Sequence, residues 1–165
     1  SKHMIELVAF QKIQQGDSIM DYLQMTAPCG LDCFNCTFFL AHEEPEAMNQ
    51  VEQWSEEFNI PVEIMLCRGC RNHNGRIPLQ MHLFGEAHRC AAYGCSQDKG
   101  VKFCGDCDEF PCDNLHPYAD KAGELPHNIK VFNLCLIKKM GLEKWAEAKA
   151  SEVRKIYFDK PWTLT

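Results

Sequence analysis

Residues 104–112 read Cys-Gly-Asp-Cys-Asp-Glu-Phe-Pro-Cys, which places three of the eleven cysteines of the chain in one short segment. The first two are separated by two residues, and the same spacing recurs at Cys33-Phe-Asn-Cys36 and at Cys67-Arg-Gly-Cys70. Such a pair can wrap one metal ion in a tight turn. A glycine inside two of the three pairs supplies the backbone freedom that this turn requires. The pairs therefore predict metal-binding loops as the feature that organises the fold.

The candidate metal ligands are the ten cysteines between residues 29 and 112. They are Cys29, Cys33, Cys36, Cys67, Cys70, Cys90, Cys95, Cys104, Cys107 and Cys112. A tetrahedral zinc ion takes four ligands, with Zn–S bonds of about 2.3 Å. Two zinc ions are therefore the expected cofactor. An iron–sulfur cluster is the alternative, because the same spacings permit it.

The spacing leaves open how the ligands divide between the two ions. One partition places Cys33, Cys36, Cys67 and Cys70 on one ion and Cys90, Cys95, Cys104 and Cys107 on the other. Cys29 and Cys112 are then spare or replace weaker ligands. An interleaved arrangement agrees equally well with the spacing. Three histidines lie near enough in sequence to act as nitrogen ligands, although a surface position is expected for each. They are His82, His88 and His116.

The composition is that of a globular protein, with 165 residues of which 45% are hydrophobic and 24% charged. Ser1 to Met4 resemble the remnant of an expression tag, residues 5–27 are expected to form an N-terminal helical segment, and residues 28–165 a single cysteine-rich domain. No apolar run approaches the roughly 20 residues that a membrane span needs, and no signal peptide is recognisable. We therefore expect a cytoplasmic protein, whose reduced thiols favour metal binding over disulfides.

The charge of the chain is acidic overall but unevenly distributed. The formal net charge is −6, which argues against a dedicated nucleic-acid-binding protein. Residues 67–102 nevertheless carry six basic and two acidic residues. The basic surface expected around Arg68, Arg71, Arg76 and Arg89 is the candidate contact for a protein partner.

Hydrophobic periodicity predicts helices on both sides of the cysteine pairs. Residues 45–58 begin with Pro45, which suits a first turn, and a shorter helix is expected around residues 86–93. Residues 128–140 and 142–157 predict a helical hairpin, with Gly141 between its helices. The inner face of the first of these two helices is expected to carry Ile129, Phe132, Leu136 and Met140, and Cys135 is expected to be a buried free thiol. The expected fold class is α+β and mainly helical, with irregular cysteine-rich metal-binding loops packed against the C-terminal helical hairpin. A short β-hairpin is expected near residues 102–103.

Three segments resemble a known family. Residues 29–36, 67–71 and 95–112 are similar to the motifs of the bacterial and archaeal domain-of-unknown-function family 3795, and the resemblance extends from about Pro28 to Trp145. It implies a zinc-binding, cysteine-rich module. Family members carry a further cysteine at the position of Ala87, so Cys90 or a nearby histidine is left to complete the site in this chain.

The function expected from these patterns is that of a small zinc-binding protein with structural four-cysteine sites, acting as an interaction or regulatory module. Four thiolates leave a zinc ion without an open position, so such a site shapes the fold and performs no chemistry. An iron–sulfur or thiol-redox sensing protein is the alternative, in which Cys29 and Cys112 would be reactive thiols beside the metal. A zinc enzyme would need an open coordination position and a nearby acid such as Asp106 or Glu109.

Overall fold

The computed structural model describes residues 21–115 and 129–159, and these residues are mainly helical. Within these two ranges there is no strand, and β-pairing is limited to an isolated antiparallel bridge between Thr26 and Asp32. The mainly helical class is therefore confirmed, and the β-hairpin expected near residues 102–103 is wrong. The backbone there is bonded elsewhere, because the carbonyl of Lys102 accepts from Arg71 and the N–H of Phe103 donates to the Asp106 carboxylate.

The first described helices surround the earliest cysteine pair. Helix α2 (Tyr22–Met25) is followed by the 3₁₀ turn η1 (Cys33–Asn35), the short helix α3 (Thr37–Leu40), and then α4 (Pro45–Phe58) and α5 (Val62–Met65). The helix predicted over residues 45–58 is confirmed with the same bounds. Its apolar residues are covered unevenly, since Val51 is fully buried whereas Phe58 is 57% exposed. The predicted tag remnant and residues 5–20 of the N-terminal segment lie outside the described residues.

The middle of the chain carries most of the cysteines, on or between short elements. These are α6 (Pro78–Phe84), α7 (Ala91–Asp98), and the 3₁₀ turns η2 (Cys104–Asp106) and η3 (Asp113–Leu115). The helix expected around residues 86–93 begins instead at Ala91 and runs to Asp98. Cys90 precedes it because its N–H donates to the carbonyl of Gly75 at 2.8 Å, which ties this residue to the preceding loop.

The C-terminal helical hairpin is confirmed. It consists of α8 (Ile129–Met140), followed by α9 (Leu142–Trp145), the π-helical turn η5 (Ala146–Ala150) and α10 (Ser151–Asp159), which continue one another. Gly141 separates the two arms with a φ of 85°, a conformation that favours glycine. Residue 128, where the first of the two predicted helices begins, lies outside the described residues.

The buried face of α8 differs from the expected one. Ile129, Asn133 and Leu134 are buried, whereas Phe132 is 52% exposed and Cys135 is exposed. The prediction that Cys135 is a buried thiol is therefore wrong. The polar side chain of Asn133 was not assigned to the core, yet it faces inward because it binds groups on two other segments.

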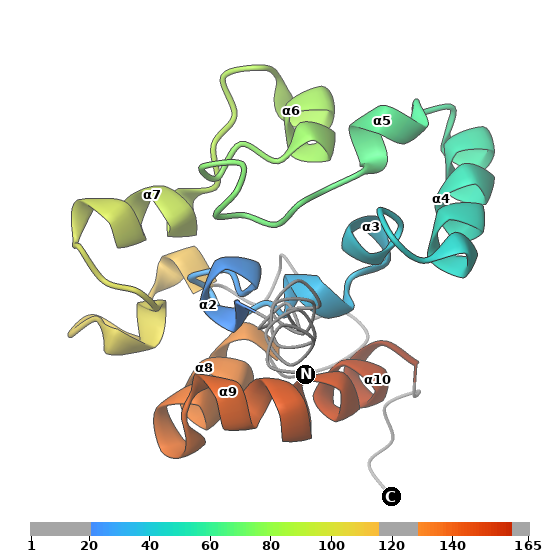
Figure 1. Ribbon diagram of the computed structural model, residues 1–165. Coiled ribbons are helices and arrows are strands. Elements are labelled where there is room, and N and C mark those ends of the chain that lie inside the picture. The colour runs from blue at the N-terminus through green and yellow to red at the C-terminus, as the bar shows by residue number, and fades with distance from the viewer. Residues whose placement is uncertain (1–20, 116–128, 160–165) are drawn as a thin grey trace, which may run out of the picture.

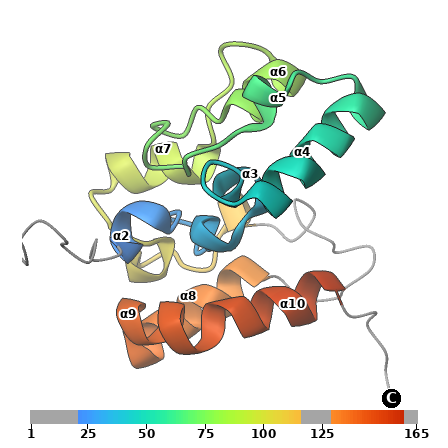
Figure 2. The same ribbon diagram turned by 45° about the vertical axis from the view of Figure 1, so that its right-hand side comes forward.

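The C-terminal helices form a layer beneath the cysteine-rich part of the chain. In Figure 2, α8, α9 and α10 run along one side of the molecule, with α2, α3, α4 and α7 above them. Phe34 of η1 packs edge-on against Trp145, with ring centroids 6.0 Å apart, and Leu134 of α8 enters the same buried cluster as Cys29 and Cys70. The predicted packing of the cysteine-rich loops against the helical hairpin is thus confirmed. None of the helices within residues 21–115 and 129–159 has the length and apolar character to cross a bilayer.

Candidate metal centre

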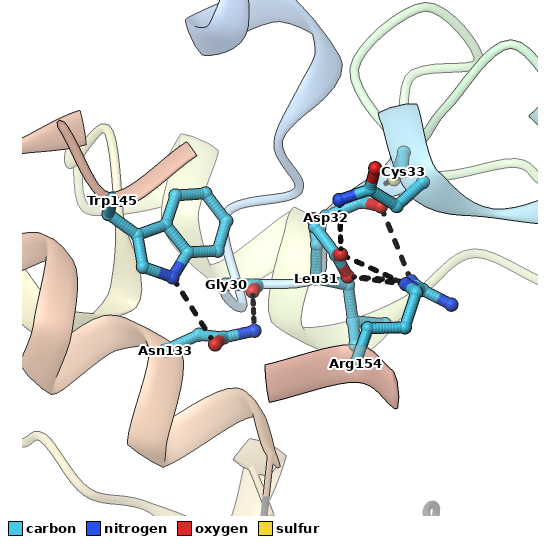
Figure 3. A network of polar contacts seen from close by, with 8 residues as sticks. Gly30, Leu31, Asp32, Cys33, Asn133, Trp145 and Arg154 are labelled. Atoms are coloured by element: carbon cyan, nitrogen blue, oxygen red, sulfur yellow. Dashed lines mark hydrogen bonds and ion pairs between the residues drawn. The ribbon is translucent and has the colours of Figure 1, made fainter. Parts of the chain in front are cut away.

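The loop from Cys29 to Cys33 is anchored to the C-terminal layer by two polar contacts (Figure 3). The amide of Asn133 donates to the carbonyl of Gly30 at 2.9 Å and accepts from the indole N–H of Trp145 at 3.3 Å. Arg154 donates to both carboxylate oxygens of Asp32, at distances between 2.6 and 3.0 Å. The loop that precedes the first cysteine pair is therefore positioned by residues more than a hundred positions away in the sequence.

Gly30 allows this loop to approach α8 closely. Its φ is 89°, and a Cβ atom at this position would lie 2.9 Å from the carbonyl oxygen of Lys130 and 2.9 Å from Leu134 Cγ. Both the backbone conformation and the lack of space therefore require glycine between Cys29 and Leu31.

Four cysteines line one small cavity between α7 and the segment that follows it. We call Cys95, Cys104, Cys107 and Cys112 the cavity cluster, and the cavity between them has a volume of about 20 Å³. Cys95 is on α7, and the other three lie on the 3₁₀ turn η2 and the chain after it. Successive turns fold this chain back, as the N–H of Cys107 donates to the Cys104 carbonyl and the N–H of Phe110 to that of Cys107, both at 3.1 Å.

The thiols of the cavity cluster interact electrostatically. The pKa of Cys104 is raised to about 11, first by burial and then by the neighbouring Cys112, Cys95, Cys90 and Cys107, since their thiolates would repel a negative charge on Cys104. A cation among these sulfurs would reverse the effect and favour the thiolate form.

The first two cysteine pairs meet in a second group, formed by Cys33, Cys36 and Cys67, which we call the knuckle cluster. Burial raises the pKa of Cys33 to about 11, the backbone N–H of Cys70 lowers it, and the charges of Cys67 and Cys36 raise it. Burial also raises the pKa of Cys67, whose sulfur accepts a hydrogen bond from the N–H of Gly69 at 3.3 Å.

Cys70 lies between the knuckle cluster and two further thiols, the buried Cys29 and the half-buried Cys90. A hydrogen bond from Cys70 lowers the pKa of Cys90, and the N–H groups of Tyr93 and Ala92 at the start of α7 lower it further. The same hydrogen bond, together with burial, raises the pKa of Cys70. Burial raises the pKa of Cys29 to about 12, and Lys130 opposes this shift.

The structure groups the ten candidate ligands differently from the partition that follows sequence order. Cys112, left spare in that partition, lines the cavity with Cys95, Cys104 and Cys107, whereas Cys90 is not among the residues around it. Cys90 lies beside Cys70 instead. The grouping depends on the packing of α7 against the 104–112 segment, which spacing alone does not specify.

The three candidate histidines do not join these groups in the described part of the chain. His82 is exposed on α6, His88 stacks against Phe84 with ring centroids 5.1 Å apart, and His116 lies outside the described residues. A histidine that the spacing did not single out, His42, is hydrogen-bonded to the backbone of Cys67. Its buried Nε2 has no hydrogen-bond partner among the residues that the structure describes. The spacing of the cysteines gave no indication that His42 would lie beside Cys67.

A basic side chain accompanies each group of cysteines. The positive charge of Arg154 interacts with Cys36 and Cys33, that of Arg71 with Cys70 and Cys104, and that of Lys130 with Cys29 and Cys90. Lys99 accompanies the cavity cluster, since the hydrogen bond with Glu109 raises its pKa, as do the charges of Cys107 and Cys95. Positive charges at these places would offset the negative charge of thiolates.

All eleven cysteines are free thiols. Across residues 21–115 and 129–159, no three His, Cys, Asp or Glu side chains are arranged closely enough to hold a metal ion as they stand. The cysteines thus lie in neighbouring groups. Their side chains would have to move before several sulfurs could bind the same ion.

The fold and the site define a mainly helical, cysteine-rich domain, in which two of the thiols belong to a buried apolar cluster. The chain belongs to the family described as Protein of unknown function (DUF3795), which matches residues 25–117. This confirms the resemblance seen in the sequence, over a span that includes all ten candidate ligands and ends before α8. No curated protein and no solved structure matches the chain.

Proposed function

We propose that this protein is a small cytoplasmic zinc-binding module, in which two structural zinc ions fix the cysteine-rich loops so that they present an interaction surface. The observation that supports this best is the cavity cluster, because four cysteines from two separate segments line a single cavity of about 20 Å³. A space of that size admits one ion or one water molecule and no organic substrate.

The cavity cluster has the donor set of a closed structural zinc site. Four thiolates complete a tetrahedron and leave no position for a reacting water, which favours a structural role over catalysis. Zinc binding would bring the four sulfurs to Zn–S distances of about 2.3 Å. Lys99 beside Cys95 and Cys107 would offset part of the net negative charge of such a site.

The second proposed site is built on the knuckle cluster. Cys33, Cys36 and Cys67 supply three thiolates, and Cys70 is the proposed fourth ligand because its backbone and side chain both lie beside Cys33. His42, next to Cys67, is the alternative donor. Arg154, held by Asp32, is the neighbouring cation.

The proposed partner surface contains the arginines of the basic segment. Three of them also brace the loops: Arg71 donates to the carbonyl of Thr26, Arg76 to that of Glu86 and Arg89 to that of Asn74. A guanidinium that is bonded to a neutral carbonyl keeps its positive charge, so these groups would still attract an acidic partner. Zinc, by fixing the loops, would keep the arginines in place.

The metal itself is the first quantity to measure. Anaerobically purified protein is expected to contain two zinc ions per chain by elemental analysis and to show no visible absorbance. Iron with a brown absorbance would contradict the zinc assignment and establish the iron–sulfur alternative. A preparation that contains neither metal and does not take up added zinc would contradict both.

Substitution of a single cysteine should remove one ion selectively. Cys107→Ser is expected to reduce bound zinc from two ions per chain to one, because the cavity cluster would lose one of its four thiolates. Cys135→Ser is the matched control, since this exposed thiol of α8 lies outside every cysteine group. It should leave both ions bound. Two ions in the Cys107 variant, or one in the Cys135 variant, would contradict the assignment of the cavity cluster.

A further inference from the structure

A groove lies between the N-terminal helices and the last helix, next to the proposed knuckle site, whose Cys36 lines one end of it. It has a volume of about 710 Å³ and is lined by residues of α3, α4 and α10, together with the η1 turn. In Figure 2, α10 runs below α3 and α4. Pockets that hold small organic ligands have volumes of roughly 300–1,000 Å³, so the groove is of that size.

One wall of the groove carries two basic side chains. Ser151, Arg154, Lys155 and Phe158 line it from α10, at positions three and four residues apart that share one face of a helix. Arg154 is fixed by Asp32, which is itself fully buried, while Lys155 is exposed and has no carboxylate partner within the described residues. No Asp or Glu residue is among those that line the groove. Because Asp32 offsets the charge of Arg154, Lys155 is the unpaired charge on this wall, and it favours a negatively charged group.

The opposite wall is aromatic. Phe38 and Trp54 line the groove and pack edge to face, with ring centroids 5.5 Å apart. Trp54 is only half-buried, so that part of its side chain is accessible. Aromatic side chains of this kind bind planar rings by stacking, with a tolerance for the identity of the ring.

The two walls define one class of ligand. Arginine and lysine bind phosphate, the hydroxyl groups of Thr37 and Ser151 can hydrogen-bond its oxygens or a sugar, and the aromatic wall can stack on a base. A phosphate ion alone would leave Phe38 and Trp54 unused, and an uncharged aromatic compound would leave Lys155 unused. We propose that this groove binds a small anion that carries an aromatic ring, of which a nucleoside monophosphate is the representative.

Calorimetric titration of the purified full-length chain with adenosine monophosphate (AMP) tests this proposal. AMP is expected to bind with a Kd below about 1 mM, a modest affinity for a ligand of this size. Adenosine carries the aromatic base without the phosphate, and ribose phosphate carries the phosphate without the base. Each should bind at least tenfold more weakly than AMP. No heat of binding with AMP at several millimolar would overturn the proposal.

Two charge-reversal variants place the binding at the groove. Lys155→Glu is expected to raise the Kd for AMP at least tenfold, and Lys139→Glu, an exposed lysine of α8 outside the groove, should leave it unchanged. Both residues are on helix surfaces, and circular dichroism can verify that both variants fold. Trp54→Ala should weaken the binding of AMP and of adenosine but not the binding of ribose phosphate. Equal Kd values for AMP in the Lys155 and Lys139 variants would overturn the assignment to this groove.

Discussion

Arg154→Met is expected to destabilise the protein by about 3 kcal/mol, as measured by urea unfolding followed by circular dichroism. The substitution keeps most of the side-chain volume but leaves the Asp32 carboxylate, which is 0% exposed, without its positively charged partner. Breaking a buried pair from one side costs about 3–5 kcal/mol, and the 22% exposure of the Arg154 side chain places the expected value at the lower end. The loop of the first cysteine pair should loosen at the same time, because Asp32 lies directly before Cys33.

A surface ion pair on the same helical arm provides the control. Lys149→Met removes the contact between Lys149 and Glu152, whose side chains are 46% and 56% exposed, and should cost less than about 1 kcal/mol. The double variant Asp32→Asn, Arg154→Met should be less destabilised than the sum of the single variants, since the two side chains interact directly. If Arg154→Met is no more destabilising than Lys149→Met, the pair has no structural role.

Removal of the proposed zinc by a chelator is expected to have the larger effect and to unfold the cysteine-rich part of the chain. Apparent binding free energies of structural zinc are about 10–16 kcal/mol at neutral pH, and this energy contributes to folding. Thermal unfolding in the presence and absence of EDTA should show a large fall in Tm. Much of the buried cluster around Cys29 and Cys70 consists of thiols and of side chains on irregular loops. Without a cross-link, these loops would not hold the cluster in its packed arrangement.

Restoration by metal separates zinc removal from other effects of the chelator. Excess zinc should return Tm to its original value, and magnesium should not, because magnesium binds thiolates poorly. The Cys107→Ser variant should show a smaller fall on chelation than the unsubstituted chain, since one ion is already missing. A Tm that does not change after both ions have been removed would contradict the proposed structural role of zinc.

Local features of the fold could be predicted because they depend on neighbouring residues. Helix α4 has the predicted bounds, since Pro45 suits a first turn and the apolar residues that follow it recur with helical period. The hairpin of α8 and α9 to α10 follows from its periodicity and from Gly141. The cysteine motifs also indicated the family to which the chain belongs.

Which face of α8 is buried could not be predicted from the periodicity of its apolar residues. An apolar pattern would bury Phe132, but the structure buries Asn133 because its amide satisfies the carbonyl of Gly30 and the indole of Trp145. A buried polar side chain is favourable when its hydrogen bonds are made, and these partners lie on other segments. Cys135 is exposed as a result of this orientation of the helix.

The sequence by itself determined that this protein is a mainly helical member of its family, with ten cysteines confined to residues 29–112. These properties depend on composition, spacing and helical period. Only the tertiary structure decided that Cys112 joins Cys95, Cys104 and Cys107, and that Arg154 holds Asp32 across 122 positions of the chain. The physical reason is that such contacts arise where helices pack, and the geometry of packing depends on all of the surfaces that meet there.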